Sequence, residues 1–320
     1  MSFSTLLDPA ILFFLLGVLA GSVRSNLEIP APITRFLSLY LLMAMGLKGG
    51  FALAAAGLTG AMLAAVASAL LLALVLPAGD YWLLRRLANR FDAAAIAATY
   101  GSVSAVTFIT AMQFLDREGT SYGGHMTVAM VLMESPAIFM AVMLAAMARR
   151  EQTPGAAFSM RPLLHEAFTD GGQILLLGSL AIGAITGAKG EAVMQPFSGD
   201  LFKGMLAFFL LEMGLQVSRQ LGVFRTASPL LLVYALAAPL LHALAALLLA
   251  RLTGLSTGDA TLLAVLAASA SYIVVPAVLR HAIPEAQPAL YFGLSLGVTF
   301  PFNLLIGIPL YAQAARWLTG

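Results

Sequence analysis

The sequence predicts an all-α polytopic membrane protein in which ten transmembrane helices form two inverted five-helix repeats. Composition is the first observation: 60% of the 320 residues are hydrophobic, only 10% are charged, and the mean hydropathy is +0.93. A soluble domain of this length carries far more charge. The second is a series of apolar runs close to the length of about 20 residues that spans a bilayer as a helix. The third is an internal repeat with a period of about 167 residues.

Charged residues, glycines and prolines divide the apolar sequence into spans. In chain order, the predicted spans cover about 8–22, 32–50, 56–78, 91–115, 124–148, 172–188, 199–217, 228–252, 258–281 and 287–316. The first lacks a preceding basic segment and a cleavage site, so we expect a retained helix and not a signal peptide. The longest polar stretch, 149–171, is predicted to be a cytoplasmic linker between a first repeat (1–148) and a second (172–320).

The fourth and ninth spans carry the strongest match between the repeats. An aspartate, Asp92 or Asp259, opens each span, and we interpret both as helix N-caps. Ser-x-Ser then interrupts each apolar run, at residues 102–104 and 269–271. Polar, helix-weakening centres at matching depth in two halves of a membrane protein are typical of a transporter's binding site. We therefore predict that the fourth and ninth helices are broken and that the breaks cross at the midplane.

Two weaker matches keep the same register. Met-Gly-Leu at 45–47 in the second span recurs at 213–215 in the seventh, and Glu-Ser-Pro at 134–136 in the fifth has a counterpart in Thr-Phe-Pro at 299–301 in the tenth. Because five spans is an odd number, the second repeat must enter the membrane from the opposite side, which makes the repeat inverted.

Basic residues divide unequally between the two sides of this topology. About eleven Lys and Arg residues near the span ends fall on one side and about six on the other. The positive-inside bias favours the richer side as cytoplasmic. Both termini are then predicted outside a bacterial inner membrane, with the 149–171 linker inside.

The hydroxyl groups at the two breaks are the candidate binding groups. A helix break in hydrocarbon leaves backbone N–H and C=O groups that cost roughly several kcal/mol each unless protein, ion or substrate satisfies them. Hydroxyls donate to an oxyanion and accept from a hard cation such as Na⁺. The candidates are Gly101, Ser102, Ser104, Thr107, Ser269 and Ser271, with Tyr272 beside the second break. The alternative is that these small residues only permit close helix packing.

Three ionisable residues interrupt other apolar runs. Glu134 in the fifth span either ligates a cation, supports the first broken helix or forms a packing salt bridge. Glu212 is interpreted as structural. His242 is interpreted as a hydrogen-bonded core histidine, with a proton relay as the alternative. The chain has no cysteine and no nucleotide-binding loop, zinc signature or nucleophile elbow, so we expect no enzyme activity, no resident cofactor and no nucleic-acid partner.

Five stretches together resemble the sodium-dependent bicarbonate transporters of cyanobacteria and their bacterial homologues. They are 42–50, 101–104, 133–137, 267–271 and 276–284, and the similarity covers essentially the whole chain. The resemblance implies a core domain that moves against a gate domain, often in a homotrimer, and Na⁺-coupled uptake of a small anion between the fourth and ninth spans. It also implies that a PII-like regulator binds the central linker.

The resemblance assigns site-forming segments by position. Gly101, Ser104 and Thr107 match the family's first segment, and Ser269 and Ser271 match the second. The chain departs from the pattern beside the second break. The cyanobacterial members carry an acidic residue at the position of Tyr272 and Ser-Gly in place of Val-Val at 274–275.

The leading function is therefore secondary active import of a small anion, bicarbonate, coupled to Na⁺. Two alternatives stay open. A carrier of the bile-acid symporter-like type would take a larger organic anion. A membrane sensor or assembly protein would use the same scaffold without transport.

Overall fold

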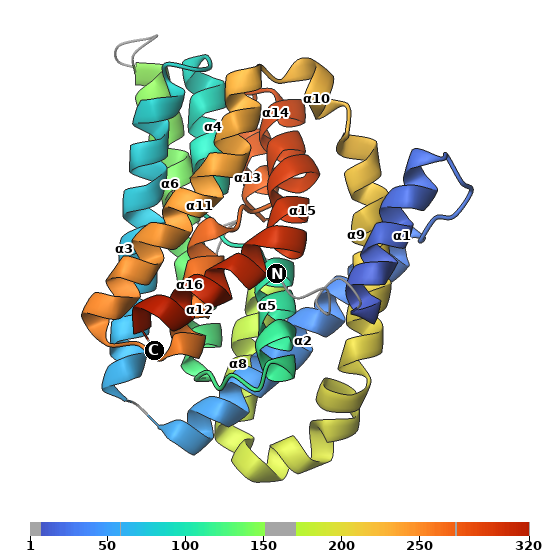
Figure 1. Cartoon of the computed structure of the whole chain (residues 1–320), viewed down its shortest axis with the longest axis vertical. Coiled ribbons are helices and arrows are strands. Elements are labelled where there is room, and N and C mark those ends of the chain that lie inside the picture. Colours follow the sequence, from blue (N-terminus) through green and yellow to red (C-terminus); the bar gives the residue numbers. More distant parts are fainter. Residues whose placement is uncertain (1–7, 58, 151–170, 273, 320) are drawn as a thin grey trace.

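The computed structural model describes residues 8–57, 59–150, 171–272 and 274–319, and within these ranges the regular structure is entirely helical (Figure 1). The all-α prediction is therefore confirmed. Almost all of the predicted linker 149–171 lies outside the described residues.

The helices fall on the predicted apolar runs, with boundaries that differ by several residues. The first half contains α1 (Pro9–Ser22), α2 (Ala31–Ala56), α3 (Gly60–Leu84), α4 (Arg90–Tyr100), α5 (Ala105–Arg117) and α6 (His125–Arg150). The second half contains α8 (Gly171–Met194), a π-helical turn (Gln195–Asp200), α9 (Phe202–Gln220), α10 (Val223–Thr226), α11 (Pro229–Thr253), α12 (Thr257–Ala268) and α13 (Val274–Ala282). The final helical stretch runs through α14 (Pro288–Leu294), η2 (Ser295–Thr299), α15 (Phe300–Phe302), η3 (Asn303–Gly307) and α16 (Ile308–Thr319).

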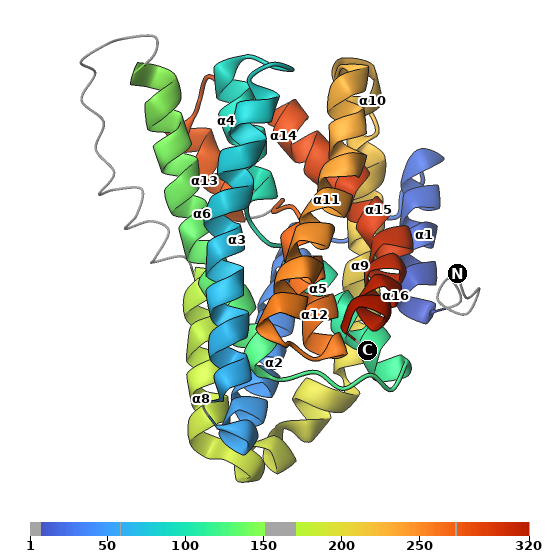
Figure 2. The ribbon, with the colours of Figure 1, turned by 60° about the vertical axis from the view of Figure 1, so that its left-hand side comes forward.

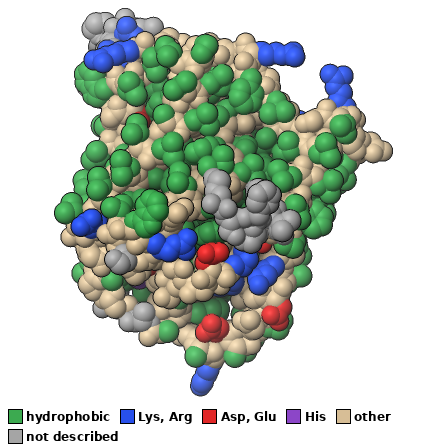
Figure 3. All heavy atoms as spheres, viewed as in Figure 1, with side chains coloured by type: hydrophobic (Ala, Val, Ile, Leu, Met, Phe, Trp, Pro, Cys, Tyr) green, Lys and Arg blue, Asp and Glu red, His purple; other side chains and the backbone are tan. Residues whose placement is uncertain are grey.

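Six stretches of the described residues are long and apolar enough to cross a membrane. They are Ala31–Ala55, Gly60–Leu84, Arg90–Arg117, Ile174–Thr226, Pro229–Thr253 and Pro288–Thr319. Figure 3 shows apolar side chains densest over the upper half of this face, with lysine and arginine at its upper corners and in a band across its lower half. This distribution is that of a multi-pass membrane protein.

The helices form two groups (Figures 1 and 2). One group pairs α1 with α9 and α2 with α8. The other gathers α3, α4 and α6 with α11, α12 and α16, and the two helix breaks lie within it. Both helix breaks therefore belong to the same group of helices.

Glycines allow the close pairing in the first group. A Cβ atom on Gly214 of α9 would collide with the backbone carbonyl of Phe14 in α1. A Cβ on Gly46 of α2 would lie 2.6 Å from the carbonyl oxygen of Leu176 in α8. The repeated Met-Gly-Leu of the sequence therefore marks two equivalent helix contacts, in which small residues let the backbones approach.

The prediction that Asp92 and Asp259 are N-caps is wrong. Asn89 and Ser256, three residues earlier, cap α4 and α12 by accepting hydrogen bonds from the first backbone N–H groups. The aspartates instead bind the other half of the chain. Asp92 accepts from the backbone N–H of Gln287, before α14, and Asp259 accepts from that of Gly123, before α6, both at 2.7 Å.

Two ion pairs repeat the same arrangement at the helix ends. Arg149 of α6 binds Glu285 at 3.0 Å, and Arg316 of α16 binds Glu118 at 3.5 Å. Each pair joins one half of the chain to the other. Arg149 is separated from Arg316, and Glu118 from Glu285, by the same interval that separates Ser102 from Ser269.

Candidate functional site

The first break separates α4 from α5 over residues 101–104. Gly101 is required by packing, since a Cβ there would lie 2.5 Å from the Cβ of Pro77 in α3. Ser104 caps α5: its Oγ accepts from the backbone N–H of Thr107 at 3.2 Å and from the Thr107 hydroxyl at 2.9 Å. A Ser that caps the helix ahead is a strong local signal for a new helix start. The predicted break is therefore built from residues within one short segment.

The second break separates α12 from α13 and includes residues 269–272. The Ser269 hydroxyl donates to the carbonyl of Leu266 at 2.9 Å, and the Ser271 hydroxyl accepts from the backbone N–H of Val275 at 3.3 Å. The carbonyl of Ala268, freed where α12 ends, accepts from the side-chain amide of Asn303 at 2.8 Å. This break therefore depends on a residue from a distant helix.

The two breaks bind each other directly. The backbone N–H of Ser104 donates to the Ser269 hydroxyl at 3.0 Å, and the backbone N–H of Ser271 donates to the carbonyl of Thr99 at 2.9 Å. Ser104 and Ser271 occupy matching positions in the repeat, so each half sends one N–H into the other. We call residues 99–107 and 268–275 together the crossing.

The crossing is closed in this structure. Ser102, Ser104, Thr107, Ser269, Ser271 and Tyr272 are each exposed by 5% or less. Ser104 donates its hydroxyl to the Tyr272 hydroxyl at 3.3 Å, and the Tyr272 ring packs edge-on against Phe300 with centroids 5.2 Å apart. Tyr272 therefore fills the space beside the Ser104 hydroxyl.

One hydroxyl of the crossing makes no hydrogen bond within the described part of the chain. Ser102 Oγ is buried and has no hydrogen-bond partner among the described residues. Buried polar atoms are nearly always paired, so this hydroxyl marks the point where a ligand oxygen or an ion is most readily accommodated. No three His, Asp or Glu side chains gather into a metal-binding group in the described part of the chain. A cation here would be held by hydroxyl and carbonyl oxygens.

Four residues that support the crossing, Asn303, Tyr311, Tyr100 and Thr299, are not among the predicted site residues. Asn303 is held by the hydroxyl of Tyr311, which donates to its Oδ1 at 2.8 Å. The Tyr100 hydroxyl shares a 2.6 Å hydrogen bond with that of Thr299, which donates in turn to the carbonyl of Ala235 at 2.7 Å. Asn303 is a polar residue inside an apolar run, and that is the signal that marks it. Glu134 lies in α6, but its side chain is outside the described residues.

A small cavity lies beside α5, the helix that follows the first break. It has a volume of about 280 Å³ and lies between α1, α5 and α9. Thr110 and Gln113 line it from α5, on the turns that follow Thr107. Arg117 of α5 and Lys203 of α9 line it too, and Arg117 binds Asp8 at 2.8 Å. The cavity lies between the two helix groups and carries two basic side chains and one acidic side chain, Asp8.

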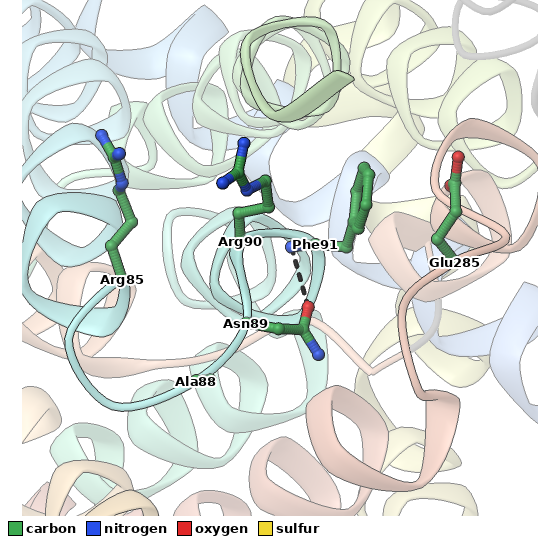
Figure 4. Close-up of a pocket in the computed structure, with 6 residues that line it drawn as sticks. All are labelled: Arg85, Ala88, Asn89, Arg90, Phe91 and Glu285. Atoms are coloured by element: carbon green, nitrogen blue, oxygen red, sulfur yellow. Dashed lines mark hydrogen bonds between the residues drawn. The ribbon is translucent and has the colours of Figure 1, made fainter. Parts of the chain in front are cut away.

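A larger polar pocket of about 460 Å³ lies away from the crossing (Figure 4). It is formed where α4 begins, by Arg85, Asn89, Arg90, Phe91 and the loop residue Glu285. Asn89 is engaged as the cap of α4, and Glu285 is engaged by Arg149. The pocket therefore belongs to the loops at one end of the molecule, and we do not assign the binding site to it.

Comparison with known proteins agrees with the resemblance of the sequence motifs. The family model of the Na⁺-dependent bicarbonate transporter superfamily matches residues 9–316. No curated protein matches the chain. The family match spans both helix groups, both breaks and the crossing between them. The chain therefore belongs to the Na⁺-dependent bicarbonate transporter superfamily.

Proposed function

We propose that the protein is a secondary active transporter that imports a small anion, bicarbonate, across a bacterial inner membrane with Na⁺ as the coupling ion. The observation that carries the proposal is the crossing itself. Two helix breaks from the two halves of the chain meet through Ser104 and Ser269, and buried hydroxyls surround the contact. Membership of the bicarbonate transporter superfamily supports the substrate class and the ion.

We propose further that ten spans form two inverted repeats, residues 1–148 and 172–320. Three pairs of contacts support this. Each aspartate at the start of a broken helix binds a loop of the opposite half, and each arginine at the end of α6 or α16 binds a glutamate of the opposite half. At the crossing, Ser104 and Ser271 each donate a backbone N–H to the opposite half. The distribution of arginines supports a topology with both termini outside.

In this proposal the hydroxyls that now bind one another release those hydrogen bonds and bind the ligands instead. An anion would accept from hydroxyls and from the backbone N–H groups at the start of α5, while Na⁺ would take hydroxyl and carbonyl oxygens. Opening requires the Ser104–Tyr272 hydrogen bond to break. The α1–α2–α8–α9 group would act as the gate, and the 280 Å³ cavity beside Arg117 would be the outer entrance.

Uptake into proteoliposomes tests the proposal. We expect labelled bicarbonate to accumulate only under an inward Na⁺ gradient, and S104A combined with S271A to remove accumulation. The double variant must first be shown to elute as a folded species. A matched control is Ser22→Ala, because Ser22 is exposed and its hydroxyl donates to the carbonyl of Val18 within α1. Accumulation without Na⁺ contradicts the coupling, and accumulation by the double variant contradicts the site.

Tyr272 favours the non-transporting alternative, because its ring fills the crossing. Counterflow of bicarbonate and of larger organic anions separates the three functions. Exchange of an organic anion alone favours the bile-acid symporter-like carrier. Absence of any exchange in a folded protein favours a sensor or assembly role.

A further inference from the structure

A buried acid–base pair lies outside the crossing, between α3 and α11. Asp80 Oδ1 is 3.1 Å from His242 Nε2, and the two side chains are 9% and 7% exposed. Both residues sit in helices long and apolar enough to cross the membrane. Ionisable groups are expensive in that setting, and those that persist usually act on a proton, an ion or a substrate.

The Asp80–His242 pair does not use all of its hydrogen-bonding groups. An ion pair that served only helix packing would be expected to use all of them. Asp80 Oδ2 and His242 Nδ1 are both buried and have no hydrogen-bond partner among the described residues. Both residues line a cavity of about 510 Å³, together with Tyr234 and apolar residues of α3 and α11. The cavity is otherwise apolar, so these three side chains supply its polar groups, and a water molecule bound to them can carry a proton to the pair.

The internal repeat provides a control for packing. When the first residues of α3 and α11 are aligned, Asp80 corresponds to Leu249 and His242 corresponds to Ala73. Ala73 is fully buried, and Leu249 packs against the core. The equivalent positions in the repeat are therefore both occupied by apolar side chains. Helix packing does not require an ion pair at this position.

The pair is connected to the first break through α3. Pro77, one turn before Asp80, packs against Gly101, the first residue of the break. Tyr100 precedes Gly101, and its ring packs against that of Tyr234 at an angle of 56°, with ring centroids 5.0 Å apart.

In the described part of the chain, the titratable groups that face Asp80 are His242 and Tyr234 from α11 and Tyr100 from α4. A change of charge on Asp80 or His242 therefore acts on the helix that carries the break.

We propose that Asp80 and His242 form a proton-binding site, separate from the crossing, whose occupancy shifts the first break between closed and open states. When His242 binds a proton from water, its ring becomes positively charged. The ring then forms an ion pair with the Asp80 carboxylate, which favours the packed arrangement seen here. Loss of that proton leaves the Asp80 carboxylate facing a neutral ring, without a counter-charge, in a mostly apolar cavity, which favours hydration and opening. Only the effect on transport rests on the proposed function; proton binding does not.

The closed-to-open shift can be measured without transport. The chain has no native cysteine, so S102C reports access to the crossing by its rate of maleimide labelling. After normalisation to unfolded protein at each pH, we expect labelling to rise about threefold or more between about pH 5 and pH 8. The rise should disappear in S102C with D80N and in S102C with H242Q. The control is S102C with H125Q, because His125 pairs with Asp259 at another helix end; it should keep the rise.

Proton binding itself is tested by ¹⁵N-histidine NMR of the full chain. The chain has four histidines, and H242Q identifies the His242 signal by its loss. We expect that signal to change with pH, and we expect Asp80→Asn to require a more acidic solution for the same change, because the charged ring loses its counter-charge. A His242 signal that ignores pH, or D80N and H242Q that keep the wild-type labelling response, overturns the proposal. If labelling and the His242 signal respond to pH as expected but bicarbonate is not taken up, the proposed substrate is wrong and the proton-binding site is still supported.

Discussion

The two helix breaks share a backbone plan and differ in how that plan is stabilised. At the first, Ser104 caps α5 and binds Thr107, three residues ahead. At the second, the freed carbonyl of Ala268 is satisfied by Asn303, from a helix 35 residues further along the chain. The helix that follows the first break is therefore capped locally, whereas the second break depends on a side chain from a distant helix. Equivalent substitutions should accordingly have unequal effects.

The largest difference in stability is expected where the helix before each break ends, at Gly101 after α4 and at Ala268 in α12. Gly101→Ala places a methyl group 2.5 Å from Pro77, and we expect a loss of about 1–3 kcal/mol in the free energy of unfolding. Its counterpart, Ala268→Gly, only loosens a helix end and should cost about 0.5–1 kcal/mol. Unfolding in mixed detergent micelles measures both. Equal losses would contradict the view that α3 packing fixes the first break.

Asn303 provides the next test, because it is the tertiary support of the second break. Asn303→Ala leaves the buried Ala268 carbonyl without a partner, which we expect to cost about 1–3 kcal/mol. The control is Tyr311→Phe, which removes only the hydroxyl that holds Asn303 and should cost about 0.5–1.5 kcal/mol. Unfolding in mixed detergent micelles measures both losses. If Y311F cost more than N303A, the Asn303–Ala268 contact would not be the main support.

The two serines at matching positions differ by less. Ser104→Ala removes a cap acceptor used twice by Thr107 and a donor to Tyr272, so we expect a loss of about 1–2 kcal/mol. Ser271→Ala removes one 3.3 Å acceptor and should cost about 0.5–1 kcal/mol. The backbone donations of both residues survive substitution. Near-equal single losses would show that the cap of α5 adds little to the crossing.

This difference also explains what the sequence could predict. Apolar runs and Ser-x-Ser predict the helices and both breaks, because those signals are local. The first break's cap lies within that local pattern. Asn303, the Tyr100–Thr299 pair and Asp80–His242 join residues far apart in the chain, and a single sequence carries no distances between them. The N-caps were misassigned because Asn89 and Ser256, one turn earlier, compete for the same role as the aspartates.

The smallest effect concerns the ion pairs that join the two halves at the helix ends. The hydrogen bond from Arg149 holds the pKa of the Glu285 carboxyl below its usual value. A lowered pKa contributes stability that is present at neutral pH and is lost as the pH falls through that lowered value. Because the Glu285 side chain is 40% exposed, we expect Glu285→Gln to cost at most about 0.5 kcal/mol at pH 7.

The matched control is Glu118→Gln, because the equivalent pair with Arg316 is longer, at 3.5 Å, and similarly exposed. We expect its cost at pH 7 to be smaller still. E285Q should flatten the acid unfolding profile below about pH 4.5. Thermal unfolding across pH 3–7 in one detergent distinguishes the two variants. A larger loss in E118Q would mean that the two halves are held together mainly at the end that carries α5 and α16. That outcome would contradict the distances, because the shorter of the two ion pairs lies at the other end.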